Sequence, residues 1–247
     1  METDSHRDAP HWFTTTHWSV VLAAKEDASA SPESQQALER LCGIYWYPLY
    51  AYARRKGYDT ESAKDLTQGL FARLFERNDL ANVQRDKGKF RSFLLASLNH
   101  FMSDEWDKAR AQKRGGDKVL LSLDESSGEE RYRLEPADNM DPEKLFERRW
   151  ALTLLDQALE RLKENYTKTG KSELYEALKV FALAEPNAPT YVQLAAQLGR
   201  AEGTIKSDVS RLRENYREMI REQVAHTVSD PAEIDDEIRY LIRVISG

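Results

Sequence analysis

Basic and hydroxyl side chains recur on one side of a predicted helix that begins shortly after Gly199. Lysine and arginine bind DNA phosphates, arginine also pairs with the edge of guanine, and hydroxyls bind either the backbone or a base edge. The residues that this pattern turns outward are Thr204, Lys206, Ser207, Ser210, Arg211 and Arg213. Their chemistry predicts a helix that lies in the major groove of DNA.

The stretch from Thr190 to Val224 has the spacing of two helices that pack against each other through a tight turn. Glycine makes such a turn at the lowest cost, and the small Ala195 permits a close helix crossing. The apolar residues on the inner faces are Leu194, Ala195, Leu198, Ile205, Val209 and Leu212. We interpret the stretch as a helix-turn-helix that binds DNA; the alternative is an ordinary helical hairpin with a solvated charged face.

The composition suits a helix-rich protein with small cores. Of the 247 residues, 32% are charged and 40% are hydrophobic. No apolar run approaches the ~18 residues of a membrane helix, and WSVVLAA at 18–24 is too short and lacks the basic flank of a secretion signal. Because Cys42 is the only cysteine, disulfides and cysteine-based metal sites are excluded within one chain. We therefore expect a cytoplasmic protein without membrane contact, metal or cofactor.

The net charge of −6 is distributed unevenly along the chain. Residues 85–118 carry nine Lys and Arg against five Asp and Glu, and residues 200–221 carry six against four. Residues 115–143 carry three against nine and form an acidic connector. This distribution indicates two basic modules that each bind nucleic acid.

Apolar residues at a spacing of three to four predict an all-α fold, because no stretch alternates with period two for long. Helices are expected at 17–25, 35–56, 61–77, 90–114, 143–165 and 172–184 before the helix-turn-helix. Glycine, proline and the lack of a period predict a flexible acidic linker at 115–142. The expected domains are an N-terminal extension (1–34), a helical domain (35–114), the linker (115–142), the helix-turn-helix domain (143–226) and a C-terminal helix (227–247).

Three motifs together resemble the RNA polymerase sigma factors of the extracytoplasmic-function (ECF) type, within the sigma-70 family. ESAKDLTQGLFARLFER at 61–77 is similar to the family's helix that binds the polymerase clamp, usually DAEDLVQEVFLRLW. FRSFLLASLNHFMSDEWDKARAQKR at 90–114 is similar to the helix that opens and reads the −10 promoter element. EGTIKSDVSRLR at 202–213 is similar to the −35-reading helix, commonly GTVKSRLHRAR. The resemblance covers about 35–225, and the extensions at both ends resemble those of one subgroup.

The resemblance implies that the chain binds core RNA polymerase, through the clamp coiled coil of the β′ subunit, and promoter DNA. The implied polymerase-binding residues are Glu61, Asp65, Gln68 and Arg73. In 90–114, the residues offered to DNA are Asn99, Lys108, Arg110, Lys113 and Arg114. Segment 78–89 corresponds to the loop that holds a base flipped out of the −10 strand.

Two motifs depart from the family pattern. Where the family places an acid–Ala–acid–acid run, this chain has Ser-Ala-Lys-Asp at 62–65, and Gly69 replaces a usual glutamate. Phosphorylation at Ser62 or Thr67 would each restore about −1.5 to −2 charges. A Ser/Thr kinase is therefore a candidate partner and phosphorylation a candidate switch for polymerase binding; the alternatives are unmodified hydroxyls and control by an anti-sigma protein. In the recognition helix, Asp208 replaces a typical arginine and would repel phosphates.

Other function classes fit fewer residues. A stand-alone helix-turn-helix regulator that binds an operator as a dimer explains 172–225 but leaves 35–114 without a role. For an enzyme, the histidines at 6, 11, 17, 100 and 226 lack metal-ligand spacing, and neither a glycine-rich phosphate loop nor a nucleophile with a base partner is visible. We therefore expect no catalytic activity.

The C-terminal segment predicts an amphipathic helix at 231–245, capped by Asp230. Its apolar face comprises Ile234, Ile238, Leu241, Ile242 and Ile245. We expect this face to pack onto the helices of residues 143–226. Two roles are open for the helix: structural capping, or autoinhibition in which its acidic flank shields a basic surface.

Overall fold

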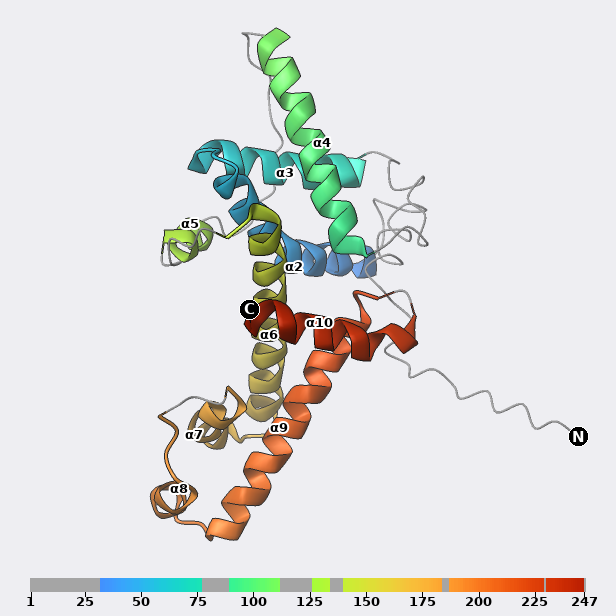
Figure 1. Ribbon diagram of the computed structural model, residues 1–247. Helices are drawn as coiled ribbons and strands as arrows, with labels where there is room; N and C mark the ends of the chain where they lie inside the picture. Colours follow the sequence, from blue (N-terminus) through green and yellow to red (C-terminus); the bar gives the residue numbers. More distant parts are fainter. Residues whose placement is uncertain are drawn as a thin grey trace, which may run out of the picture. The chain divides into compact units, whose positions relative to one another are not determined.

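The computed structural model describes residues 32–76, 89–111, 126–133, 140–183, 187–228 and 230–246. In these ranges all regular structure is helical, so the fold is all-α, as predicted. The helices are α2 (Pro32–Arg55), α3 (Thr60–Glu76), α4 (Phe90–Ala111), α5 (Ser126–Arg133), α6 (Pro142–Lys168), α7 (Ser172–Ala182), α8 (Tyr191–Leu198), α9 (Glu202–Ala225), the 3-10 turn η4 (Pro231–Glu233) and α10 (Ile234–Ser246) (Figure 1). The helix expected at 17–25 lies outside the described residues. Among the described helices, none has the length and apolar character needed to cross a membrane.

The chain divides into two compact units, and the division falls inside α6. Unit 1 comprises Met1–Leu152 and Ala225–Gly247, and unit 2 comprises Thr153–Val224. The chain therefore leaves unit 1 partway along α6 and returns to it at the end of α9. The sequence had placed a boundary at 142/143, so the structure assigns the first part of α6 to the preceding helices instead.

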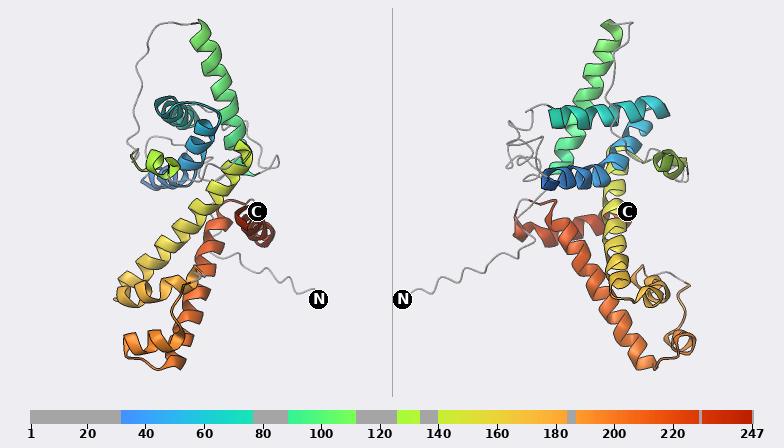
Figure 2. Two further views of the ribbon diagram at one scale, coloured as in Figure 1. Left: turned by 60° about the vertical axis from the view of Figure 1, so that its left-hand side comes forward. Right: turned by 180° about the vertical axis from the view of Figure 1, so that it is seen from behind.

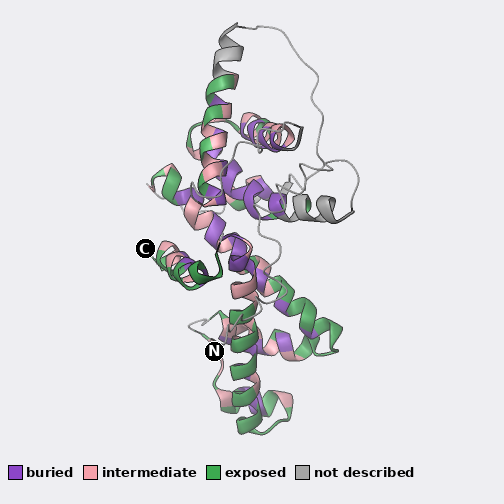
Figure 3. Ribbon diagram, turned by 90° about the vertical axis from the view of Figure 1, so that its right-hand side faces the viewer, coloured by how far each residue is buried: buried purple, intermediate pink, exposed green. Residues whose placement is uncertain are grey.

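Unit 1 has its core between α2, α3 and α4. Apolar residues at three-to-four spacing give each helix one buried stripe, which Figure 3 colours purple. Tyr45 of α2 packs edge-on against Phe90 of α4, with 5.4 Å between the ring centroids. Gly57 ends α2 with a φ of 99°, and Asp59 then caps α3 by accepting a hydrogen bond from the Ser62 N–H at 2.7 Å. The core side chains include Leu49, Tyr52, Leu66, Leu70, Leu94 and Leu98.

The crossing of α3 and α4 explains the glycine at position 69. A Cβ atom on Gly69 would lie 2.8 Å from Cζ of Phe101 in α4. Such a contact forces a neighbouring group to move, so the absent side chain lets the aromatic ring lie directly on the α3 backbone. This packing gives a physical reason for the departure from the glutamate that the family usually has here.

The acidic linker differs from the prediction because part of it forms the helix α5, which packs on α2. A Cβ atom on Gly128 would lie 2.7 Å from Cζ3 of Trp46, so glycine permits this close approach. Glu129 accepts a hydrogen bond from the Tyr50 hydroxyl and pairs with Arg54 at 3.3 Å. An eight-residue helix is too short to show a clear period in the sequence, so composition alone could not reveal it.

The first part of α6 also packs on α2. Glu143 accepts hydrogen bonds from the Tyr52 hydroxyl at 3.0 Å and from Lys56 Nζ at 3.2 Å. Phe146 and Trp150 are buried one and two turns further along α6. These contacts attach the start of α6 to unit 1.

The C-terminal helix α10 buries a face that only partly matches the predicted one: of the predicted residues, Ile234 and Leu241 are buried, and Ile238 and Ile245 are half-buried. Ile234, Glu237 and Leu241 are buried, whereas Ile242 is 57% exposed. Asp230 caps η4, as predicted, by accepting a hydrogen bond from the Ala232 N–H at 2.9 Å. Figures 1 and 2 show α10 near the start of α4. Glu237 of α10 pairs there with Lys89 and Arg91.

Unit 2 has its own core, formed by the second part of α6 with α7, α8 and α9. Tyr166 and Tyr175 pack with their ring centroids 5.8 Å apart, and Phe181 stacks on Tyr191 at 5.3 Å. The cluster also contains Leu162, Leu178, Leu194, Ala195, Ile205, Val209 and Leu212. All of these residues lie between 153 and 224, so the core of unit 2 is self-contained.

Candidate functional site

The candidate DNA-binding element consists of α8 and α9 with the turn between them. Thr190 and Gln193 form a reciprocal capping box at the start of α8. Gly199 follows the helix with φ 62° and ψ 35°, the left-handed region that glycine adopts at no steric cost. The Arg200 N–H donates to the Ala195 carbonyl at 3.0 Å and closes the turn. Local sequence therefore determines where α8 ends and α9 begins.

Five of the six residues predicted to face DNA are exposed on α9. They are Thr204, Lys206, Ser207, Ser210 and Arg211. On the opposite side, Ile205, Val209 and Leu212 are buried in the core of unit 2. This arrangement leaves ammonium, guanidinium and hydroxyl groups in solvent on one face, where they can bind phosphates and base edges.

Arg213 is the exception in this set. It is half-buried, and its Nε donates a hydrogen bond to the Phe181 carbonyl at the end of α7, at 3.0 Å. The sequence predicted an outward direction from helical spacing alone. A long side chain can instead fold back along the helix surface to a partner on another element.

Acidic side chains partly neutralise the exposed lysine and arginine residues at the start of α9. Asp208 accepts from Arg200 at 2.9 Å and lies 4.0 Å from Arg211. Glu202 pairs with Lys206 at 2.7 Å, and this hydrogen bond raises the pKa of Lys206. Asp208, which stands where the family usually has arginine, therefore acts as a counter-ion to Arg200 and Arg211 within the protein. These pairs are mostly exposed, so phosphates can compete for Lys206 and Arg211 at low cost.

The candidate polymerase-binding residues of α3 have different surroundings. Glu61 and Asp65 are exposed, and Gln68 is half-buried. Arg73 points toward α4, where its Nη1 donates to Asp104 Oδ2 at 2.8 Å and its guanidinium lies 5.8 Å from the centre of the Phe101 ring. The two carboxylates are thus presented to solvent, while Arg73 also joins α3 to α4.

The two candidate phosphorylation sites differ in access. Ser62 lies in the first turn of α3 and is partly exposed. Thr67 is 0% exposed, and its hydroxyl donates to the Ala63 carbonyl at 2.8 Å. A kinase could reach Thr67 only if α3 separated from the core, whereas Ser62 is reachable in the folded protein.

The candidate DNA-binding residues of α4 are only partly described. Asn99 is half-buried, and its side-chain oxygen accepts a hydrogen bond from the Tyr52 hydroxyl at 2.9 Å, so the amide is engaged with α2. Lys108 and Arg110 belong to α4, but the structure does not describe where their side chains lie. Lys113 and Arg114, like the loop 78–88, also lie outside it.

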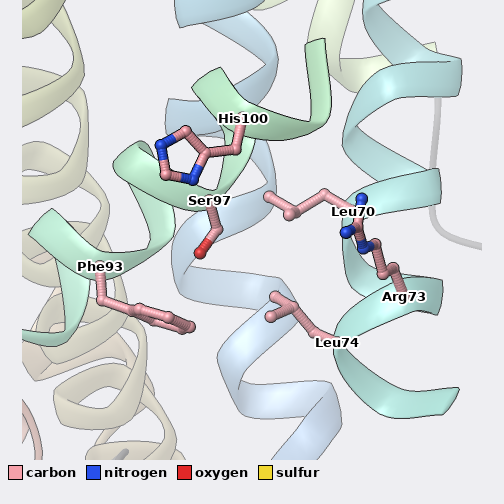
Figure 4. Close-up of a pocket in the computed structure, with 6 residues that line it drawn as sticks. All are labelled: Leu70, Arg73, Leu74, Phe93, Ser97 and His100. Atoms are coloured by element: carbon pink, nitrogen blue, oxygen red, sulfur yellow. The ribbon is translucent and has the colours of Figure 1, made fainter. Parts of the chain in front are cut away.

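A small cavity of about 120 Å³ lies between α3 and α4 (Figure 4). Its lining residues are Leu70, Arg73, Leu74, Phe93, Ser97 and His100. The apolar groups come from both helices, and the polar ends of Arg73, Ser97 and His100 lie around them. The volume suits one side chain of a partner better than a substrate, since ligand pockets are usually of about 300–1,000 Å³.

The structure adds a charged cluster in unit 1 that the sequence did not predict. Arg91, in the first turn of α4, pairs with Glu237 of α10 and with Glu147 of α6 at 2.7 Å. Burial alone would lower the pKa of Arg91, but Glu147 and Glu237 offset this effect and raise it, so the guanidinium remains charged. A sequence signal did exist: Glu237 stands between Ile234 and Leu241, at the spacing of a buried face.

The comparisons with known proteins support the same assignment. A family model described as ECF sigma factor matches residues 35–222, which is more than half of the 247-residue chain. No curated protein and no solved structure gives a match. The matched segment includes the three motifs at 61–77, 90–114 and 202–213 and excludes α10. The chain therefore belongs to the ECF sigma factors, subunits that bind RNA polymerase and direct the initiation of transcription at promoters.

Proposed function

We propose that this sigma factor divides its contacts between its helices. In this proposal α3 binds the clamp coiled coil of the β′ subunit, α4 with the preceding loop binds the −10 element, and α9 binds the −35 element. The observation that supports it best is the two-sided character of α9. Its apolar face closes the core of unit 2, while Lys206, Arg211 and three hydroxyl residues stay in solvent.

Substitutions in the two DNA-binding modules test this division. We expect Lys206→Ala to relax base preference at the −35 element and to leave the −10 preference unchanged, because Lys206 lies on the exposed face of α9. Arg217→Ala removes the same charge from an exposed position about three turns further along α9 and is the matched control. Arg110→Ala should weaken binding across all sequences and reduce the salt slope by about 1. The measurement is in vitro transcription by holoenzyme on a promoter library, and the division is wrong if Lys206→Ala and Arg110→Ala alter the same promoter positions.

The stand-alone operator-binding regulator, which the sequence left as an alternative, explains only residues 172–225. The family match also covers the helices from residue 35 onward and therefore favours a polymerase-bound factor. Copurification of the full chain with core polymerase tests this directly, since a stand-alone regulator would bind DNA at high affinity without the core enzyme.

We further propose that phosphorylation strengthens polymerase binding, with Ser62 as the more accessible site. A phosphate there would join Glu61 and Asp65 on the exposed face of α3 and would lie in the first turn, where the helix dipole favours negative charge. Ser62→Asp should therefore bind core polymerase several-fold more tightly than Ser62→Asn, which has nearly the same shape without the charge. At Thr67, burial predicts that Thr67→Glu lowers stability, whereas Thr67→Val keeps the shape. Wild-type protein from a kinase-free host that already binds as tightly as Ser62→Asp would exclude the switch.

A further inference from the structure

The C-terminal helix α10 holds the start of α4 through a buried carboxylate. Glu237 is 1% exposed and pairs with both Lys89 and Arg91. Arg91 is 3% exposed and lies between two aromatic rings, with 4.2 Å to the Trp150 centroid and 4.8 Å to the Tyr240 centroid. One acidic residue of α10 therefore neutralises two basic residues at the start of α4, Lys89 just before the helix and Arg91 in its first turn.

A buried ion pair is a weak way to stabilise a docked helix. The desolvation of the charges offsets most of their attraction, and a well-packed apolar residue at the same position often gives equal or greater stability. Only Ile234 and Leu241 among the apolar residues of α10 are fully buried. The sequence thus places a carboxylate where an apolar residue would hold α10 more firmly.

The groups around Arg91 lower the free-energy cost of separating α10 from Lys89 and Arg91. If α10 leaves, Arg91 keeps the 2.7 Å pair with Glu147 and the stacking on Trp150, so no unpaired charge is left in the core. The Lys89 side chain is already 42% exposed and can become hydrated. Glu237 becomes hydrated on the separated helix, so hydrogen bonds to water replace its ion pairs with Lys89 and Arg91.

The position of Lys89 and Arg91 suggests which anion replaces the Glu237 carboxylate when α10 leaves. Residues 85–91 contain four Lys and Arg against one Asp, and they lead into α4, the helix that we assign to the −10 element. A phosphate offers the same ligand chemistry as Glu237, namely anionic oxygens at hydrogen-bonding distance from an ammonium and a guanidinium group. Nucleic acid and α10 would therefore compete for the same two side chains.

We propose that α10 is an autoinhibitory latch, in which Glu237 occupies Lys89 and Arg91 until the phosphates of promoter DNA displace it. This inference rests on the proposed function, because it assigns these two residues to the DNA surface of α4. It also places the effect of the C-terminal helix on the −10 module rather than on the −35 module.

The test compares Glu237→Gln with Asp236→Asn in the full chain. Both variants remove one negative charge from α10, but Asp236 is exposed and pairs with Arg239 of the same helix. Hydrogen exchange of residues 234–246 reports whether α10 opens. Fluorescence anisotropy with a mixed-sequence single-stranded DNA oligonucleotide, repeated at several salt concentrations, reports the DNA contacts.

We expect Glu237→Gln to speed exchange in α10 by at least tenfold and to tighten DNA binding several-fold. The salt slope should steepen by about 0.7 for each phosphate contact that is gained on a single strand. Asp236→Asn should change neither the exchange nor the slope. Adding Lys89→Ala to Glu237→Gln should abolish much of the gain in affinity while α10 stays open.

Two outcomes would overturn the proposal. In the first, Glu237→Gln opens α10 but binds DNA with the affinity and salt slope of Asp236→Asn, which would make α10 a structural cap. In the second, α10 exchange does not change at all. If Glu237→Gln loses its helical circular dichroism signal, Leu241→Ala replaces it, since it loosens the apolar contact without altering charge, and the same criteria apply. Failure of the proposed function is distinguishable, because wild-type protein would then not associate with core polymerase.

Discussion

At the scale of single residues, burial controls the chemistry of Cys42. The thiol is buried in α2, and this burial, with a smaller effect of Glu39, raises its pKa from 9.0 to about 12. Because the thiolate is the reactive form, the folded protein at pH 8 should react with iodoacetamide more slowly than the unfolded chain by a factor on the order of 10³. The measurement is mass-spectrometric labelling of native and guanidinium-unfolded protein. Rapid modification of the native form would mean that α2 opens readily.

Gly69 gives a second prediction at this scale. Gly69→Glu restores the residue that the family usually has but places a side chain against Phe101, so it should lower the melting temperature. Overpacking of this kind costs about 1–3 kcal/mol. In a Phe101→Ala background the same substitution should cost clearly less, because the obstructing ring is gone. Equal losses in the two backgrounds would show that the contact does not explain the glycine.

These residues also show which side-chain positions could be predicted from the sequence. The inner positions Leu194, Ile205 and Val209 were predicted correctly, because helical periodicity alone places them. Arg73 and Arg213 could not be predicted, since each folds back to a partner on another helix, Asp104 and the Phe181 carbonyl respectively. Periodicity gives the direction of Cβ, but only the tertiary structure gives the end of a long side chain.

At the scale of elements, α5 is expected to detach when its close contact with α2 is blocked. Gly128→Val adds a side chain where a Cβ atom alone would lie 2.7 Å from Trp46. We expect faster proteolysis at 126–133 and a red shift of tryptophan emission, because Trp46 would become hydrated. Gly203→Ala is the control, since its Cβ meets nothing within 4 Å and the exchange should be neutral or stabilising by up to about 1 kcal/mol. Unchanged proteolysis in Gly128→Val would mean that α5 contributes little to unit 1.

The contact between α6 and α2 should weaken in acid. The pKa of Glu143 is lowered to about 2, first by its side-chain contact with the neighbouring Asp141 and further by hydrogen bonds that Lys56 and Tyr52 donate to it. A lowered pKa means that the folded state favours the ionised carboxylate. Its stabilising effect is complete above the ordinary pKa of 4.5 and is lost as the pH falls from there toward 2. Hydrogen exchange at 142–147 should therefore rise over this range in wild type and be less pH-dependent in Glu143→Gln.

The sequence predicted helix boundaries better than it predicted which faces of the helices are buried. The boundaries of α3 and α7 were predicted to within two residues, because Asp59 and the prolines after residue 184 mark them. The packing of α5 was not predicted, and the buried face of α10 was predicted only in part. In both elements a glycine or a carboxylate occupies the buried side, so hydrophobic periodicity gives no face for α5 and misses Glu237 in α10.

At the scale of the whole molecule, the chain is organised as one unit interrupted by another. Unit 2 begins after Leu152 and ends at Val224, and its core residues all lie within these limits. Unit 1 needs the first part of α6 and the segment after residue 225, because Trp150 and Glu237 enclose Arg91. A linear division into domains, such as the boundary at 142/143, therefore separates residues that pack together.

This organisation predicts how fragments of the chain fold. Residues 153–224 alone should be helical and should unfold cooperatively, because their core is complete. A chain in which 153–224 is replaced by a flexible Gly/Ser linker should retain unit 1 and melt at a higher temperature than fragment 1–142, which lacks Phe146, Trp150 and all of α10. Circular dichroism and thermal melts of the three proteins provide the measurement. If fragment 1–142 melted at the same temperature as the linker-joined chain, the first part of α6 and the C-terminal helix would add nothing to unit 1, and the clustered charges around Arg91 would have no role in holding it together.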